Sequence, residues 1–211
     1  MPSGMSYYPQ AIVLNGNVYV GGGKSTAQLQ QGALVMIYGL ESEEWTTLPP
    51  YSHMFFGMAV LNNQLLLIGG QQPTVGKICT TDQLGVLSEE SQQWQRSPLP
   101  PMPTPRSSMA VAYGSKWLVA AGGLNDEHRC LSKVEILSID AEKWFQGAPL
   151  PLPAEKMTTT IIGNMVVLLG GAGDHGFHKK VFFAYLDNLV SSAVTGGVSQ
   201  YIWQTLSLIH I

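Results

Sequence analysis

The feature that most constrains this chain is a short apolar run that ends in paired glycines and occurs four times. The runs consist mostly of Val, Leu, Ile, Ala and Met, and the glycine pairs are about 50 residues apart. Recurrence at such a period is typical of repeat proteins, in which each unit buries its apolar faces against its neighbours. The four pairs are Gly22-Gly23, Gly69-Gly70, Gly122-Gly123 and Gly170-Gly171.

Each repeat is predicted to form four short antiparallel strands, A to D. A two-residue turn precedes each apolar run, and Asn15-Gly16 is the strongest such hairpin signal because both residues tolerate a positive φ. Two further strands follow the glycines, and prolines end the first three units, where they stop strand D. We find no segment with a helical period of useful length. The strand D tryptophans are Trp45, Trp94, Trp144 and Trp203, and the other turns are Asn62-Asn63, Ser115-Lys116 and Gly163-Asn164.

The glycines and tryptophans are assigned structural roles. A double glycine lets the backbone pass close to a neighbouring segment where a Cβ would collide. A tryptophan is large enough to fill the gap between two packed sheets, and its complete burial is worth about 4–6 kcal/mol as an upper bound.

Composition excludes several classes of protein. The chain has 45% apolar and 12% charged residues and a net charge of −3, with no basic run that would attract nucleic acid or an acidic membrane surface. Cys79 and Cys130 are too few for a disulfide framework and are expected to be reduced thiols. Residues 1–10 lack the features of a secretory signal, and no apolar stretch is long enough for a membrane helix. We therefore expect a cytoplasmic protein.

The pattern resembles the kelch repeat, and the resemblance covers nearly the whole chain. The third repeat is the best match, with Pro105-Arg106-Ser107-Ser108, Gly122-Gly123, Val134-Glu135, Asp140 and Trp144 at the family's positions. The resemblance implies an all-β kelch-type β-propeller with four blades of four antiparallel strands. The single domain would span 1–211, with blades at approximately 6–50, 51–101, 102–153 and 154–211. In the fourth repeat, an insertion between Asn188 and Gln200 is expected to lengthen the connection from strand C to strand D.

The number of blades leaves three arrangements open. Kelch propellers are expected to have five to seven blades, whereas this chain encodes four. It could close as a four-bladed ring, share a larger ring within a dimer, or be a fragment of a longer propeller. We favour the monomeric ring, because an open arc would expose the apolar faces of its end blades.

Three motifs suggest other chemistry but are too weak to support it. Gly21 to Thr26 is similar to the end of a phosphate-binding loop, but position 18, where another glycine is needed, is Val18. Asp174, His175 and His178 could ligate a metal, but a histidine pair on a glycine-rich loop is weak evidence and is interpreted as a solvated loop. The copper ligands of galactose oxidase, a propeller enzyme, cannot be placed here. We predict no cofactor and no metal.

The binding site is expected on the loops, because a propeller is a rigid scaffold whose loops vary. The D–A and B–C loops open on one face, and the B–C loops are the least repetitive segments. Kelch adaptors that capture acidic peptides often carry an Arg sixteen residues before the double glycine. Arg106 holds this position, and His53, Ser6 and Ala154 are its equivalents. We predict a partner-binding face with Arg106, His53, Ser6, Gln71, Asn125 and Asp126; the alternative for Arg106 is a solvent-exposed loop residue. The B–C loops are Lys24 to Gly32, Gln71 to Thr81, Leu124 to Ser132 and Ala172 to Lys180.

Two functions remain open at this stage. We favour a non-catalytic module that binds a protein or peptide, such as the recognition part of an adaptor. The alternative is a propeller enzyme that processes a carbohydrate or small molecule, of the galactose-oxidase or sialic-acid-epimerase type.

Overall fold

The computed structural model describes residues 8–23, 32–88, 90–114, 116–195 and 202–207, and all structural statements concern these residues. The chain divides into two compact units, Met1–Ser107 and Ser108–Ile211.

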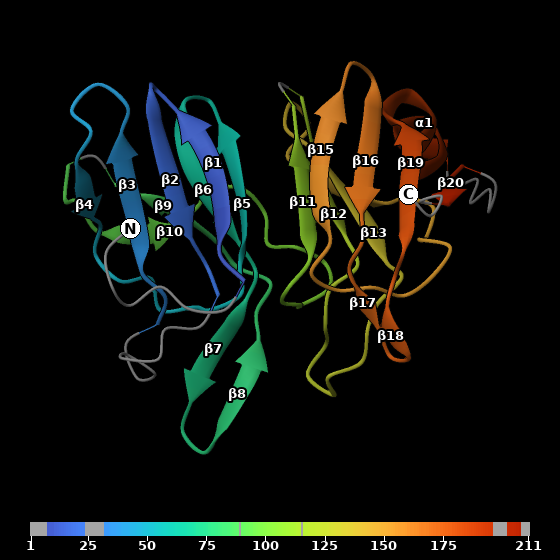
Figure 1. Ribbon diagram of the computed structural model, residues 1–211, viewed down its shortest axis with the longest axis horizontal. Helices are drawn as coiled ribbons and strands as arrows, with labels where there is room; N and C mark the ends of the chain where they lie inside the picture. Colours follow the sequence, from blue (N-terminus) through green and yellow to red (C-terminus); the bar gives the residue numbers. More distant parts are fainter. Residues whose placement is uncertain (1–7, 24–31, 89, 115, 196–201, 208–211) are drawn as a thin grey trace. The chain divides into compact units, whose positions relative to one another are not determined.

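Unit 1 contains two four-stranded antiparallel sheets, called blades 1 and 2 (Figure 1). Strands β1 and β5, the first of each blade, lie next to each other. A separate two-stranded hairpin extends from the connection between β6 and β9. Blade 1 consists of β1 (Gln10–Leu14), β2 (Asn17–Gly21), β3 (Val35–Gly39) and β4 (Trp45–Thr47). Blade 2 consists of β5 (Gly57–Leu61), β6 (Gln64–Ile68), β9 (Leu84–Leu87) and β10 (Trp94–Arg96), and the hairpin of β7 (Gln71–Thr74) and β8 (Lys77–Thr80).

Unit 2 repeats this arrangement in blades 3 and 4, with β11 next to β15. It has a shorter hairpin after β16 and one helix, α1 (Leu186–Thr195). Blade 3 consists of β11 (Ala110–Tyr113), β12 (Trp117–Ala121), β13 (Val134–Ser138) and β14 (Lys143–Gln146). Blade 4 consists of β15 (Thr158–Ile162), β16 (Met165–Leu169), β19 (Lys180–Tyr185) and β20 (Gln204–Ser207), and its hairpin of β17 (Ala172–Gly173) and β18 (Gly176–Phe177).

The predicted order of strands A to D is confirmed in all four blades. The turn signals are also correct where they can be seen: Asn15 and Gly16 have φ of 50° and 70°, and Asn62 and Asn63 have 48° and 62°. These left-handed pairs match the right-handed twist of the strands they join. In the third turn, Ser115 lies outside the described residues.

The prediction that the chain has no helix of useful length is wrong. The insertion in the fourth repeat is present between β19 and β20, but α1 occupies much of it. Leu189 and Ala193, one turn apart, are buried in the core of unit 2, with Leu186 and Val190 packed against that core. Their spacing of i, i+3, i+4 and i+7 is that of one helix face. This helical pattern is short and lies within a long connection between strands, so it was not recognised in the sequence.

Two tryptophans connect neighbouring blades by equivalent hydrogen bonds. The Trp94 indole Nε1 donates to the Pro49 carbonyl oxygen at 2.6 Å, and Trp203 Nε1 donates to the Ala148 carbonyl oxygen at 2.8 Å. Each bond joins a tryptophan at the outer strand of a unit's second blade to the linker that leaves its first blade: Trp94 begins β10, and Trp203 directly precedes β20. Trp45, in contrast, is half-buried and packs against Tyr38 with ring centroids 5.1 Å apart.

Replacement of Trp203 by Phe should destabilise the protein more than the same change at Trp45. Trp203→Phe leaves the Ala148 carbonyl without its indole donor, which costs roughly 1–3 kcal/mol for a buried group. Trp45→Phe controls for the smaller ring at a half-buried site and should cost less than about 1 kcal/mol. Urea unfolding of both variants measures the difference. Equal losses in the free energy of unfolding would contradict the proposed role of the indole hydrogen bond.

Candidate functional site

In unit 1, the linker into blade 2, the B–C loop of blade 2 and the linker that follows blade 2 meet at one end of that blade. Met54 and Gln71 exchange two backbone hydrogen bonds, at 2.8 and 2.7 Å. The Gln71 side-chain amide donates to Ser107 Oγ at 3.2 Å, and Gly70 N donates to the Arg106 carbonyl at 2.9 Å. The structure therefore brings the predicted residues His53, Gln71 and Arg106 to the same end of blade 2.

Arg106 is buried, with an exposed fraction of 0%, so the alternative of a solvent-exposed loop residue is wrong. Its Nε donates to Met102 Sδ at 3.3 Å, and its backbone N donates to the Thr81 carbonyl at 3.3 Å. The equivalent Ala154 is also 0% exposed, and its carbonyl accepts from Gly123 N at 2.8 Å. The linker backbone is held against the preceding glycine pair at this position, which turns the side chain inward. Ser6 lies outside the described residues.

His53 is also buried, with 2% of its surface exposed. Its ring meets Tyr51 edge-on with centroids 4.7 Å apart. Burial lowers the pKa of His53 from its ordinary value, and a side-chain hydrogen bond with Gln72 partly opposes this shift. Nδ1 has no hydrogen-bond partner among the described residues. In this conformation neither His53 nor Arg106 offers appreciable surface to a partner, although both lie directly beneath the loops.

The exposed surface at this end of blade 2 is provided by the β7–β8 hairpin, which extends beyond the blade (Figure 1). Val75 at its tip is fully exposed, Ile78 is 51% exposed, and Lys77 between them is also exposed. This segment was predicted to be a variable loop, and its hairpin was not predicted. The residue in the sequence that indicates this hairpin is Gly76, which has a φ of 81° in the turn between two short strands.

In unit 2, the linker into blade 4 and the B–C loops of blades 3 and 4 meet in a similar way. Glu155 and Ala172 exchange backbone hydrogen bonds at 2.8 and 2.9 Å, as Met54 and Gln71 do in unit 1. Cys130 N donates to Asp174 Oδ1 at 3.2 Å, which ties the two B–C loops together. Phe177 in the β17–β18 hairpin is 86% exposed and was not predicted as a site residue.

Asn125 and Asp126 lie in the B–C loop of blade 3. Arg129 N donates to Asn125 Oδ1 at 2.9 Å, and Asn125 N donates to the Arg129 carbonyl at 3.2 Å. Asn125 therefore shapes its own loop, whereas the neighbouring Asp126 is exposed. These two residues belong to unit 2, and His53, Gln71 and Arg106 belong to unit 1.

The motifs for other chemistry gain no support from the described residues. No group of three or more His, Cys, Asp or Glu side chains among them could hold a metal, and the His178 ring lies 3.1 Å from the Pro153 carbonyl. Burial and the neighbouring Asp174 raise the pKa of Cys130 to about 11, so its thiol is protonated near neutral pH. Lys24 to Thr26 fall outside the described part of the chain. No helix in that part is long and apolar enough to cross a bilayer.

No protein-family model matches the chain, but curated relatives do. It is 26% identical to Kelch-like protein terF of Aspergillus terreus over 182 residues, covering 81% of this chain and 39% of terF. It is 27% identical to Beta-scruin of Limulus polyphemus over 185 residues, covering 81% and 19%. It is 28% identical to the human Influenza virus NS1A-binding protein over 129 residues, covering 59% and 20%. The chain thus spans well under half the length of these three relatives.

A solved structure, described as "Structure of YjhT", resembles the fold. The TM-score is 0.72 at 17% sequence identity, and the match covers 87% of this chain and 69% of that chain. At this identity the likeness shows the propeller type of fold alone and carries no information about activity.

The burial of His53 predicts a pH dependence of stability. Its folded-state pKa lies below the unfolded value, so the unfolded chain takes up the proton first as the pH falls through 6.5. This contribution to stability is complete above pH 6.5 and is lost below it, by at most about 1.4 kcal/mol per pH unit. Urea unfolding between pH 8 and pH 5 should show that His53→Gln flattens this dependence. His128→Gln, at an exposed histidine, controls for the substitution itself, and a slope in His53→Gln equal to that of the wild type would contradict the assignment.

Proposed function

Since the chain is a kelch-repeat β-propeller protein, we propose that it is a non-catalytic recognition module that binds a protein or peptide partner. The partner contacts the B–C loops, together with the D–A linkers beneath them. A protein partner accords with the name of the human relative, Influenza virus NS1A-binding protein.

The observation that carries this proposal is the exposed apolar surface on the B–C hairpins. Val75 and Ile78 in blade 2 and Phe177 in blade 4 are exposed at 105%, 51% and 86%. Large apolar side chains that the fold leaves exposed add nothing to its stability, whereas their burial in a complex would stabilise the complex by about 1.5–3 kcal/mol for each side chain fully buried.

Polar side chains are next to these apolar ones in the sequence of both units. Lys77 lies between Val75 and Ile78 in blade 2, and Asp174 and His175 precede Phe177 in blade 4. An apolar centre within a polar rim is the usual composition of a protein interface. Asp126 in blade 3 adds an exposed carboxylate on a B–C loop.

Arg106 and His53 take a supporting role in this proposal. Both lie under loops that are fixed by backbone hydrogen bonds to the glycine pairs or to Gln71. A rigid base reduces the conformational entropy that the loops lose on binding, and so favours affinity. Gln71 contributes through the hydrogen bond that its side-chain amide donates to Ser107 Oγ.

Quantitative affinity capture from cell lysate, read by mass spectrometry, tests the proposed face in each unit. The loop variants are Val75→Glu with Ile78→Glu in unit 1, and Phe177→Glu in unit 2. The matched controls introduce the same charge at exposed apolar residues outside the B–C loops: Leu40→Glu, 53% exposed in the C–D turn of blade 1, and Ile162→Glu, 57% exposed at the end of β15.

Proteins captured by the wild type should be retained by both controls and reduced about tenfold or more by at least one loop variant. Circular dichroism should show that every variant is folded. Equal capture by the loop variants, or a loss in the controls alone, would place the interface elsewhere. If the wild type captured nothing, the recognition function itself would be contradicted.

A further inference from the structure

The two faces of blade 4 differ in burial. Side chains alternate between the faces along each strand, and residues paired in the register lie on the same face. One face carries Val166, Leu168 and Phe182, which are at most 1% exposed and belong to the core of unit 2. No residue of the other face belongs to that core cluster. We call this second face the open face of blade 4; its large apolar residues include Ile162, Val167, Leu169, Phe183, Tyr185 and Leu206.

The open face of blade 4 is apolar although it is exposed. Leu169, Tyr185 and Leu206 are 38%, 44% and 58% exposed, and Val167 and Phe183 are half-buried. None of the described strand residues on this face is charged. Strand positions that face solvent are normally polar, so an exposed apolar face without charge indicates a contact surface.

The repeat indicates what covers this face. Counted from the glycine pairs, Val167 and Leu169 correspond to Val119 and Ala121 of blade 3. Both blade 3 residues are 1% exposed, and they share the core cluster of unit 2 with Leu168 of blade 4. In blade 3 this face is therefore covered by the opposite face of the next blade. The same kind of face, from another blade, would cover the open face of blade 4.

Blade 1 of unit 1 has a face of that opposite kind, and this face is also exposed. Val18 stands four residues before Gly22, as Val166 stands four residues before Gly170, so the two valines lie on corresponding faces. Val166 is fully buried, whereas Val13, which pairs with Val18, is 62% exposed. We call this the open face of blade 1; its residues include Ala11, Val13, Val18, Tyr38 and Trp45, and none of these is charged.

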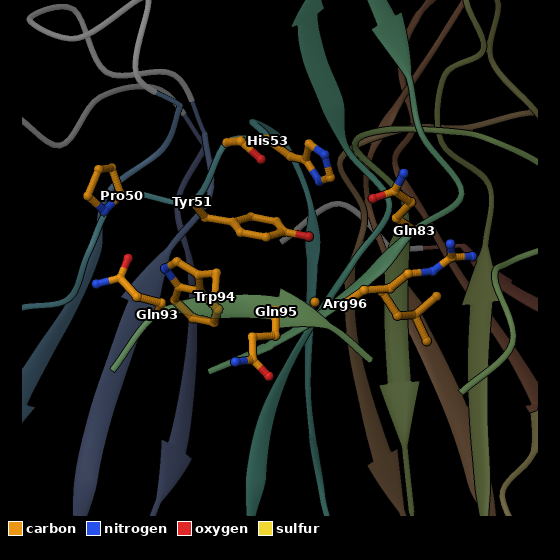
Figure 2. Close-up of a pocket in the computed structure, with 11 residues that line it drawn as sticks. Pro50, Tyr51, His53, Gln83, Gln93, Trp94, Gln95 and Arg96 are labelled. Atoms are coloured by element: carbon orange, nitrogen blue, oxygen red, sulfur yellow. The ribbon is translucent and has the colours of Figure 1, made fainter. Parts of the chain in front are cut away.

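The tryptophans also indicate that the open face of blade 1 lacks a neighbour. At the covered junction of unit 1, Trp94 packs against Tyr51 of the linker, beside a pocket of about 280 Å³ (Figure 2). The indoles of Trp94 and Trp203 donate to carbonyls of the linkers that leave the preceding blades. Trp45 is the corresponding residue of blade 1, and its indole makes no such bond within the described part of the chain.

We propose that a second copy of this chain covers these faces, so that the open face of blade 4 in one copy packs against the open face of blade 1 in the other. The two faces are of the opposite kinds that meet between blades 3 and 4, so the contact repeats one that the fold already makes. Each copy carries one face of each kind, and two such contacts in a pair of copies leave neither kind exposed. This interface goes beyond the proposed loop surface and uses none of its residues.

Light scattering on a sizing column, over a range of protein concentrations, tests the proposal with the wild-type chain. One chain has a mass of 22.8 kDa, and the proposal predicts twice this mass at the higher concentrations. A mass of one chain at every concentration would overturn it. That result is expected if the two open faces close on each other within one chain.

Val13→Glu in blade 1 and Leu169→Glu in blade 4 each place a charge on one open face. In a pair of identical variants both contacts contain the charge, so each variant should raise the dissociation constant of the dimer about tenfold or more. An equimolar mixture of the two variants should associate more tightly than either variant alone, because one contact of the mixed pair joins two unaltered faces.

The loop variants of the capture experiment are the matched controls. Val75→Glu with Ile78→Glu, and Phe177→Glu, carry the same charge outside the open faces and should keep the mass of the wild type. Circular dichroism establishes that each variant is folded. An unchanged mass in Val13→Glu or in Leu169→Glu, or a mixture that associates no better than its components, would overturn the pairing of blade 4 with blade 1.

Ile162→Glu separates this proposal from the proposed loop surface. Ile162 lies on the open face of blade 4, so its replacement should weaken the association of two copies. The same variant should still retain the proteins captured through the loops. Failure of the dimer would therefore leave the loop surface intact, and failure of capture would leave the dimer intact.

Discussion

The close approach of each linker backbone to a glycine pair is the contact on which the rest of the structure depends. Within unit 1, Phe55 N donates to the Gly23 carbonyl at 3.4 Å and Gly70 N donates to the Arg106 carbonyl at 2.9 Å; in unit 2, Gly123 N donates to the Ala154 carbonyl at 2.8 Å. A Cβ at Gly122 would overlap the Ala154 carbonyl oxygen. The position of each linker relative to the blade it leaves is thus fixed by backbone atoms, which only glycine allows.

The sequence was sufficient to predict the contacts that repeat and have a local signal, such as the strand order, the Asn-Gly turn and the insertion in the fourth repeat. It was insufficient where the tertiary contact determines the conformation. Phe55, Ser108 and Lys156 occupy equivalent linker positions and have φ of 53° to 55°, a left-handed region that these residue types rarely adopt. The inward side chain of Arg106 follows from the same linker geometry, and no local pattern marks it.

The candidate sites on the loops lie in the parts of the structure that differ from one repeat to the next. Contacts between glycine pairs and linkers recur in both units, as do the bonds from Trp94 and Trp203 to linker carbonyls. The β7–β8 hairpin and the exposed Phe177 do not recur in the same form. The rigid repeated scaffold provides stability, and the variable loops provide recognition. Sequence periodicity therefore reveals the residues that stabilise the fold but not those that bind a partner.

The most direct test of this account is the free energy of unfolding of Gly122→Ala compared with Gly114→Ala. Gly122 has a φ of +65° and faces the Ala154 carbonyl, whereas a Cβ at Gly114 would meet nothing within 4 Å. Urea unfolding should show a loss of at least about 2 kcal/mol for Gly122→Ala and a change within about 0.5 kcal/mol for Gly114→Ala. If both variants were equally stable, the linker would not depend on the glycine contact, and the account would be wrong.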